Sequence, residues 1–457
     1  MSFEKGLITP MVLVIVTVSA IIMFSLAFVV VNQYQLTQRT TALEQARQIA
    51  ESGLDYYRWR LAHFPDDFQD GTGQAGPYLH DFYNPEGEIV GQYQLTITPP
   101  NPGYNIFTIS STGWNIQYPT AKETVSIQYG TPSMAEYALL YNNDIWLPPG
   151  FTINGPVHAN GGIRNDGINT SNMSSALSTY LCTQKNGGCT PPTDKPGIWG
   201  DGGDEGLWIY PAPRIDFDAI NIDYVFIKSE AQSRGLYLNP SNKNGYHLVF
   251  NPNGSYSVYL VSQVDNFKGG KGNPGCDQLY GTIKTESLVG TYQQSSTPII
   301  FAEDNLWVQG TITSPLTVTA AKFPIDTQNA DIWINENFNY STTNGTIQAG
   351  LIAQHDVIIH RDVPTDFILH GAILAQTGSL LRHDYGVSCA GSPENSVRNS
   401  FTFYGSLISA QQSQWNWGTS MNSGFVSGTI TYDTNLRKNP PPYFPSTSQY
   451  QIIDWAD

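Results

Sequence analysis

The run LITPMVLVIVTVSAIIMFSLAFVVV, from Leu7 to Val31, contains 25 residues and no charge. As a helix it would be about 37 Å long, which is enough to cross a hydrocarbon core of about 30 Å with some tilt. The apolar core of a secretory signal peptide is shorter, about 7–15 residues, and ends at a cleavage site with small residues. We therefore predict a transmembrane helix over residues 7–31.

The helical pattern continues beyond the apolar run. Apolar side chains recur at steps of three, four and seven residues, which makes a helical stripe. The positions are Leu36, Leu43, Ala46, Ala50, Leu54, Tyr57 and Leu61. Pro65 and the turn-rich stretch 66–73 end the helix. We predict an amphipathic continuation over 32–64 that packs against a soluble domain.

Three features of this region resemble the type IV pilin superfamily, which includes the pseudopilins of type II secretion. They are Lys5-Gly6, the apolar run from Leu7, and Ala50-Glu51-Ser52-Gly53-Leu54, which is similar to the Ala-Glu-x-Gly-Leu pattern of minor pilins with large ectodomains. The resemblance implies that residues 1–6 are a leader peptide, removed by a prepilin peptidase between Gly6 and Leu7. It also implies a helix that binds other pilin or pseudopilin subunits, and an ectodomain outside the cytoplasm.

The chain departs from major pilins at one position. They usually carry Glu at the fifth mature position, where it can neutralise the amino terminus of a neighbouring subunit. This sequence has Met11 there, after Pro10. An unpaired carboxylate is costly in lipid, and a subunit without one cannot make that pairing itself. The resemblance therefore implies a minor or priming subunit rather than the repeating filament subunit.

Residues 65–133 are predicted to form a pilin-like antiparallel β-sheet. Segments 88–98, 105–114 and 122–129 alternate apolar and polar residues, and prolines and glycine at 99–103 separate the first two. The apolar face of this sheet would cover the soluble half of the helix, which gives an α+β head.

A repeated pattern, apolar-x-Gly-x-apolar-x-small, follows residue 134. Its glycines are Gly155, Gly310, Gly350, Gly371, Gly405 and Gly428. Intervals of about 20–40 residues between the late copies are typical of a solenoid, in which each strand buries its apolar face only against neighbouring coils. We predict a right-handed parallel β-helix-like solenoid over 134–440, followed by a C-terminal tail over 441–457. A β-sandwich would need evenly spaced hairpins with Asn-Gly or Asp-Gly turns, which are scarce between the late repeats.

The interval 165–298 interrupts the repeat and is predicted to be an inserted α/β module. It holds a candidate helix over 218–233, with Asp218 as its N-cap, and a hairpin of 246–250 and 256–261. Insertions in solenoids often meet the partner, so this module is a candidate recognition surface. A lid over an exposed end of the stack explains it equally well.

Four cysteines, Cys182, Cys189, Cys276 and Cys389, allow three pairings. We predict the bridges Cys182–Cys189 and Cys276–Cys389, because a short glycine-containing loop closes readily and an exported location favours oxidation. A zinc site of four thiolates would need C-x-x-C spacing, which neither interval has.

Motifs for catalysis or cofactor binding are absent from the sequence: it has no Gly-x-Ser-x-Gly elbow, no P-loop and no His-Glu-x-x-His. We predict no cofactor, no metal and no catalytic residue. Four histidines gather near three aspartates, and exposed corners of a solenoid explain them more simply than a metal site. These residues are His355, His360, His370, His383, Asp356, Asp362 and Asp384.

Two further groups are candidates for ligand binding. The acidic loop 201–205 could bind calcium, but it lacks the full twelve-residue pattern, so a solvated turn is the simpler interpretation. Tyr404, Trp415 and Trp417 could stack on a sugar, or could cap the final coils.

Composition narrows the function classes. Lys+Arg 22 against Asp+Glu 38 gives a net charge of −16, and an acidic chain repels nucleic-acid phosphates. The aromatic content of 12% excludes a disordered chain. We predict a non-enzymatic minor pilin or pseudopilin-like protein, anchored by a single span in the cytoplasmic membrane and reaching the pilus or cell surface after assembly. Its solenoid would serve adhesion, capping or assembly initiation, with a surface glycan or a protein as ligand.

Two alternatives stay open. One is a membrane-tethered β-helix carbohydrate-active enzyme, although no carboxylate pair repeats on adjacent coils, as glycosidase chemistry would need. The other is a single-pass surface structural protein that is never processed.

Overall fold

The computed structural model describes residues 8–217, 222–271, 276–386, 395–417, 423–447 and 449–456. They divide into two compact units. The first unit holds the residues up to 100 together with 107–129 and 452 onward, and the second holds 101–106 and 130–451. The predicted leader 1–6 and the cleavage site at Gly6 and Leu7 lie outside the described residues.

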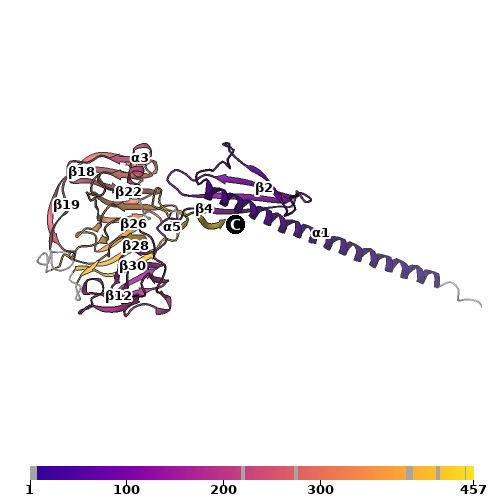
Figure 1. Cartoon of the computed structure of the whole chain (residues 1–457), viewed down its shortest axis with the longest axis horizontal. Coiled ribbons are helices and arrows are strands. Elements are labelled where there is room, and N and C mark those ends of the chain that lie inside the picture. Colours follow the sequence, from indigo (N-terminus) through magenta and orange to yellow (C-terminus); the bar gives the residue numbers. More distant parts are fainter. Residues whose placement is uncertain are drawn as a thin grey trace, which may run out of the picture. The chain divides into compact units, whose positions relative to one another are not determined.

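The first unit combines one long helix with a sheet. Helix α1 runs continuously from Ile8 to His63 (Figure 1), and the strand order is β1-β2-β3-β4-β31, with β2 antiparallel to both β1 and β3. The strands are β1 (Tyr78–Tyr83), β2 (Ile89–Thr98), β3 (Ile106–Asn115), β4 (Lys122–Gly130) and β31 (Gln451–Ala456). The three predicted strands correspond to β2, β3 and β4. The structure differs from the tail predicted over 441–457, because β31 adds to the sheet beside β4.

The buried stripe of α1 starts later than the sequence pattern predicts. Leu36 is 64% exposed, and the buried positions are Ala42, Ala46, Ile49, Ala50, Leu54, Tyr57 and Leu61. Gly53, in the same stripe, lies so close to the sheet that an added Cβ would be 2.4 Å from Ser111 Oγ and 2.6 Å from Tyr93 Cδ2. The glycine of the Ala50–Leu54 motif therefore lets α1 lie directly on β2 and β3.

The second unit is built from short parallel strands that pair from coil to coil. Ladder A, the longest, runs through ten strands in spatial order. They are β16 (Leu236–Leu238), β20 (Ile299–Ala302), β22 (Leu316–Ala320), β24 (Ala349–Ala353), β26 (Asp366–Ala375), β28 (Val397–Ser409), β5 (Leu139–Tyr141), β8 (Val157–Ala159), β11 (Met173–Ser175) and β15 (Trp208–Ile209).

Two more ladders complete the coils. Ladder B joins β17 (Gly245–Phe250), β21 (Leu306–Ile312), β23 (Ile332–Tyr340), β25 (Val357–Ile359) and β27 (Leu380–Leu381). Ladder C joins the later parts of β21 and β23 to the earlier parts of β26 and β28, and continues through β30 (Ser423–Tyr432), β7 (Phe151–Asn154) and β10 (Ile168–Asn169). Strands β6 (Ile145–Leu147), β9 (Ile163–Asn165) and β14 (Ile198–Trp199) form a separate parallel sheet. A mostly-β unit with extensive parallel pairing is confirmed, and the right-handed winding of a closed β-helix stays a prediction.

The order of the coils differs from their order in the sequence. The late strand β28 pairs with the first strand of the unit, β5, through Leu407 and Leu139. The chain therefore enters the stack in its middle and winds to the end marked by β15. It then crosses to β16 at the other end and winds back (Figure 1).

The interval 165–298 is less of an insertion than predicted. Strands β10, β11, β15, β16 and β17 within it pair in parallel with the stack. The longer elements outside the ladders are helix α3 (Tyr224–Arg234), the hairpin of β12 (Thr179–Cys182) and β13 (Thr193–Pro196), and the strands β18 (Ser255–Gly269) and β19 (Asp277–Gln293). The predicted hairpin is the antiparallel pair β17 and β18.

Helix α3 begins later than predicted. Its N-cap is Asp223, whose Oδ1 accepts a hydrogen bond of 2.8 Å from the Phe226 amide, and Asp218 lies outside the described residues. The remaining short elements are α2 (Gln184–Gly187), η1 (Glu205–Leu207), η2 (Gln294–Ser296), β29 (Asn416–Trp417) and α5 (Asn435–Lys438).

The repeat glycines lie where one coil stacks tightly on the next. Gly405 has φ 150°, and an added Cβ would be 1.9 Å from the carbonyl oxygen of Gly371, its partner in the neighbouring strand. Only glycine fits both this backbone conformation and this spacing. The apolar residues that flank the glycines fill one continuous core, which includes Ile153, Ile312, Leu369 and Leu407.

Candidate functional site

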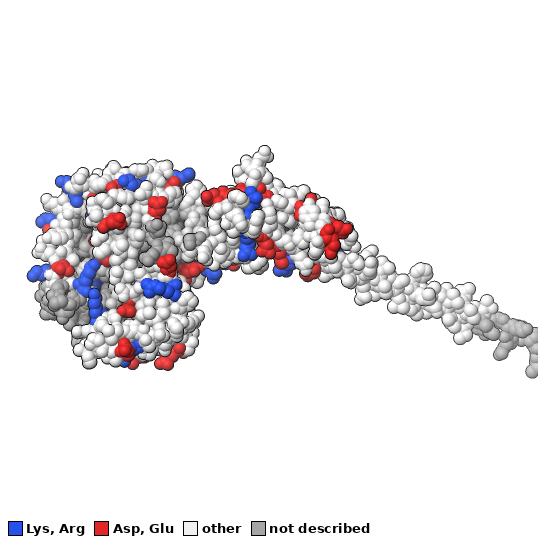
Figure 2. Space-filling view, viewed as in Figure 1, with Lys and Arg blue, Asp and Glu red and all other residues white. Residues whose placement is uncertain are grey.

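The N-terminal half of α1 is an exposed apolar surface. Its large side chains are open to solvent, and examples are Met11 (68% exposed), Phe24 (78%) and Leu36 (64%). No Asp, Glu, Lys or Arg occurs between Ile8 and Gln38, so Figure 2 shows this part of the helix as an uncharged surface. Among the described residues, α1 is the helix that could cross a membrane by its length and composition.

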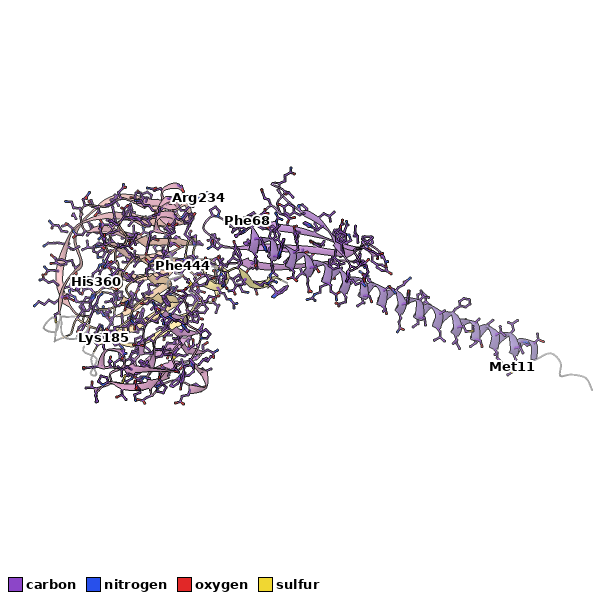
Figure 3. All side chains as sticks on the ribbon, in the orientation of Figure 1. Met11, Phe68, Lys185, Arg234, His360 and Phe444 are labelled. Atoms are coloured by element: carbon purple, nitrogen blue, oxygen red, sulfur yellow. A yellow bond between two sulfur atoms is a disulfide. The ribbon has the colours of Figure 1, made fainter. Side chains whose placement is uncertain are left out.

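A hydroxyl group in this half of α1 is satisfied inside the helix. Thr17 Oγ1 donates to the carbonyl oxygens of Leu13 and Val14, both at 2.9 Å. A hydroxyl paired in this way can enter an apolar environment without losing a hydrogen bond. The small residues Ala20 and Ala27 are seven positions apart and share one face of the helix, where a second helix can approach closely. Met11, labelled in Figure 3, offers no charge to a neighbouring amino terminus.

A small groove lies on the first unit beside the buried half of α1. Its volume is about 120 Å³, and it is lined by Glu51, Leu54, Asp55, Arg58, Ile127, Ile452 and Trp455. The rim charges already pair within the helix, Arg58 with Asp55 at 3.0 Å and Glu51 with Arg47 at 3.1 Å. The strand β31 that supplies Ile452 and Trp455 was assigned to a tail by sequence analysis, which therefore missed this groove.

One predicted disulfide is present. Cys182 and Cys189 are bonded, with their Cα atoms 5.6 Å apart, and the loop between them contains α2. Cys276 is also disulfide-bonded, and Cys389 lies outside the described residues. The pairing of Cys276 with Cys389 stays a prediction.

The three aromatic residues that are candidates for stacking on a sugar make packing contacts or hydrogen bonds within the second unit. Trp415 is 5% exposed and packs with the rings of Phe151 and Phe401. Trp417 is 9% exposed, and its Nε1 donates to the carbonyl oxygen of Arg382 at 2.7 Å. Tyr404 is half-buried and donates to Asp433 Oδ1 at 3.0 Å. The indole faces are covered, so the alternative interpretation, packing against the final coils, fits Trp415 and Trp417.

The histidine cluster is not a set of exposed corners. His360 and His383 are buried, and burial lowers the pKa of His360 to about 4 and that of His383 to about 3. His370 lies in ladder C, where its Nδ1 accepts a hydrogen bond of 3.1 Å from the Tyr340 amide, and burial lowers its pKa to about 4. Neighbouring rings shield these imidazoles, for example Phe267 beside His360 and Tyr340 beside His370.

Within this cluster, His355 lies closer to carboxylates than His360 does. Its Nδ1 lies 2.9 Å from Asp331 Oδ1 and 3.4 Å from Asp356 Oδ2. The hydrogen bond to Asp331 raises the pKa of His355. These three side chains have the donor types and mutual distances of a metal site. Lys271 Nζ, however, already forms an ion pair with Asp356 and supplies the positive charge there.

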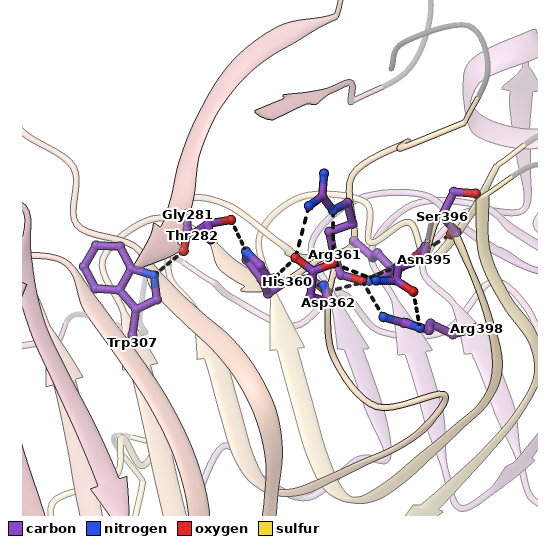
Figure 4. Close-up of polar contacts among 10 residues, drawn as sticks. Gly281, Thr282, Trp307, His360, Arg361, Asp362, Asn395, Ser396 and Arg398 are labelled. Carbon is purple, nitrogen blue, oxygen red and sulfur yellow. Dashed lines mark hydrogen bonds and ion pairs between the residues drawn. The ribbon is translucent and has the colours of Figure 1, made fainter. Parts of the chain in front are cut away.

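A buried arginine organises the end of ladder B. Arg382 is fully buried, and its guanidinium donates to the carbonyl oxygens of His360 at 2.5 Å, Arg361 at 3.0 Å and Asn395 at 2.8 Å. Figure 4 shows the polar contacts around these residues, including the pair of Arg361 and Asp362. Burial lowers the pKa of Arg382 to about 10. Sequence analysis did not single out Arg382 or Asp331, because a single charged residue carries no sequence signal that predicts its burial.

The acidic loop 201–205 serves as a cap. Asp204 Oδ1 accepts a hydrogen bond of 2.9 Å from the Gly206 amide at the start of η1. This use agrees with a solvated turn.

Comparison with known proteins gives a distant similarity among solved structures. No family model and no curated protein matches the chain. Among solved structures, the chain is similar to the competence-associated pilin ComZ from Thermus thermophilus, at 14% identity and a TM-score of 0.33, over 91% of this chain and 97% of the other. A TM-score this low does not establish a shared fold, so nothing about the function of this chain follows from it.

Proposed function

We propose that this protein is a minor pilin-like or pseudopilin-like component of a type IV pilus or a related secretion filament. Helix α1 holds it in the cytoplasmic membrane before assembly and packs among the helices of other pilin subunits afterwards. The mostly-β second unit is then displayed outside the cytoplasm, without catalytic activity of its own.

The observation that supports this function is the division of α1 into two halves. Residues 42–61 bury their apolar stripe in the first unit, whereas the uncharged half that precedes them has no covering segment among the described residues. Moving a large aliphatic or aromatic side chain from water to an apolar environment gains about 1.5–3 kcal/mol. A surface of this size is therefore stable only when lipid or other helices cover it. Because α1 is one continuous helix, the same surface can contact lipid in the membrane and other helices in a filament.

Processing gives the first test. We expect the mature protein to begin at Leu7, and intact-mass spectrometry of protein purified from membranes measures this directly. Gly6→Leu should retain the first six residues and should not enter filaments, whereas Ser2→Ala should be processed normally. A wild-type protein that keeps Met1 would favour the uncut surface anchor instead.

Helix packing gives the second test. Ala27→Leu adds three carbons to the face shared with Ala20, and Val29→Leu adds one carbon about 200° around the helix, with the same apolar character. We expect Ala27→Leu to reduce the amount of protein in sheared filaments at least tenfold, and Val29→Leu to leave it unchanged. Equal membrane levels of the two variants show that insertion is intact, and equal filament levels would contradict the proposed packing.

The role of the second unit follows from its place in such a filament. We propose adhesion, capping or assembly initiation, with a protein or glycan as ligand. Filaments that form in normal number but lose surface binding when this unit is altered would indicate adhesion. Loss of the filaments themselves would indicate capping or initiation, and turnover of a polysaccharide by the purified full chain would favour the enzyme alternative.

A further inference from the structure

A long hairpin crosses the outer face of ladder B. We call residues 261–271 of β18 and its turn, together with 276–285 of β19, the strap. Its side chains Val261 and Phe267, with Val264, Leu279 and Ile283, pack on Trp307, Trp333, Ile358 and Tyr385. The register of β18 with β19 shifts at four places, which lets the hairpin bend across the coils (Figure 1).

Polar contacts hold the strap at several points. Trp307 Nε1 donates to the carbonyl oxygen of Gly281 at 2.7 Å, and Thr282 Oγ1 lies 3.0 Å from His360 Nε2 (Figure 4). Gly270 and Asp384 exchange two backbone hydrogen bonds, at 3.0 and 2.8 Å. Next to them, Lys271 forms its ion pair with the buried carboxylate of Asp356.

Two uncharged imidazoles lie beneath the strap. His360 contacts the ring of Phe267, with centroids 5.3 Å apart, and His383 stacks on Trp333, with centroids 6.3 Å apart. Nδ1 of His383 has no hydrogen-bond partner among the described residues. Such a pocket is suited to a neutral imidazole, since a charged one would lose its hydration without replacement.

The charges around the two imidazoles are mostly positive. His360 faces Arg361, Arg382 and Arg398, with Asp362 Oδ2 3.8 Å from its Nδ1 as the opposing charge. His383 faces Lys271 and Arg382, opposed by Asp331. Protonating either imidazole in the closed state therefore adds a cation to a group of cations.

We propose that the strap is a pH-sensitive cover, closed over His360 and His383 at neutral pH and opening locally in acid. Opening, with the disulfide at Cys276 still in place, returns both imidazoles to water, where they bind a proton near pH 6.5. Because the closed form binds protons only at much lower pH, acid shifts the equilibrium towards the open form as the pH falls below about 6.5. Between pH 7.5 and 4.5 each imidazole raises the opening equilibrium about 50- to 100-fold, and the two together raise it about 10³- to 10⁴-fold. His355 does not oppose this shift, because its partners Asp331 and Asp356 lie outside the strap and stay beside it when the strap opens.

Hydrogen exchange of the full chain in detergent micelles tests the proposal. Exchange is measured by mass spectrometry at pH 7.5 and 4.5 and corrected for the intrinsic rate at each pH. We expect strap amides 262–270 and 277–285 to lose at least a hundredfold of protection at pH 4.5, and to stay much less protected than amides of β22 and β24, which report opening of the whole unit. Strap protection that does not change with pH would overturn the proposal. So would strap protection equal to that of β22 and β24 at pH 4.5, which would indicate unfolding of the whole unit.

Histidine variants identify the titrating groups. His360→Gln and His383→Gln should each reduce the pH response of the strap about 50- to 100-fold. His370→Gln is the matched control, since this imidazole is also shielded from water but packs on Tyr340 and Tyr404 in ladder C, away from the strap. An equal effect of His370→Gln would overturn the assignment of the titrating groups to His360 and His383. If a variant does not fold, the proposal is decided by the protection of the wild-type strap amides relative to those of β22 and β24.

Discussion

Replacing Gly53 with alanine tests how closely α1 lies on the sheet. In an exposed helix this change would stabilise by about 1 kcal/mol, because alanine has the higher helix propensity. Here the new Cβ would lie 2.4 Å from Ser111 Oγ and 2.6 Å from Tyr93 Cδ2. Tyr93 is only 7% exposed, so its ring has little room to move and the helix must shift instead. Overpacking of this kind costs about 1–3 kcal/mol. We therefore predict a net destabilisation of about 1 kcal/mol, opposite in sign to the propensity effect.

The assay is the free energy of local opening of residues 46–61, from native-state hydrogen exchange of the full chain in detergent micelles. Ser52→Ala, one position earlier and half-buried, controls for helix propensity. Ser111→Ala removes the nearest atom and also a buried hydroxyl without a hydrogen-bond partner among the described residues, so it should be neutral or stabilising. The double variant should recover at least about 0.5 kcal/mol relative to the sum of the single changes. A Gly53→Ala protein more stable than wild type, with no coupling to Ser111, would refute the close contact.

Three further predictions concern the second unit. Its stability should fall in acid, because burial lowers the pKa of His370 to about 4 and the unfolded chain binds the proton first; this residue alone accounts for about 2 kcal/mol lost between pH 7.5 and 5, in addition to the losses from His360 and His383. His370→Gln should remove that part of the pH slope in urea unfolding, and an unchanged slope would contradict the burial. Trp417→Phe leaves the Arg382 carbonyl oxygen without its donor and should lower the free energy of unfolding by about 1–3 kcal/mol, measured as a lower urea midpoint. An unaltered midpoint would show that this hydrogen bond contributes nothing to stability. The double change Cys182→Ser and Cys189→Ser should destabilise the α2 loop locally by about 2–3 kcal/mol. The measurement is the rate of proteolysis within residues 182–189, which should rise while proteolysis of α1 stays unchanged. Equal rates in the variant and the wild type would rule out a stabilising role of this disulfide.

Local patterns in the sequence identified the elements of this protein with short-range causes. The uncharged run and the stripe that includes Ala46, Leu54 and Leu61 predict one helix, because helical periodicity is a property of the chain itself. The pair Cys182 and Cys189 is likewise close in sequence. The repeated glycine predicts stacked strands, since a strand with one apolar face and a tight backbone position needs a neighbour on each side.

Burial of the polar residues was beyond sequence analysis. The sequence left Trp415 and Trp417 open between stacking on a sugar and capping the final coils, and it favoured exposed corners for His360 and His383. The period-two pattern fixes whether a side chain points into the coil or away from it. It contains no information about a separate segment, such as the strap, that later covers the outer face.

Local sequence patterns are enough to predict a long amphipathic helix with an uncharged half, an antiparallel sheet, and glycine-marked strands that stack, because each of these follows from residues within a few turns or one repeat. Tertiary structure alone decided that the stack is entered in its middle, that Leu407 pairs with Leu139, and that β31 returns to the first sheet. Parallel strands of similar apolar pattern can pair in many orders. Which order is adopted depends on the total burial and hydrogen bonding of the whole chain.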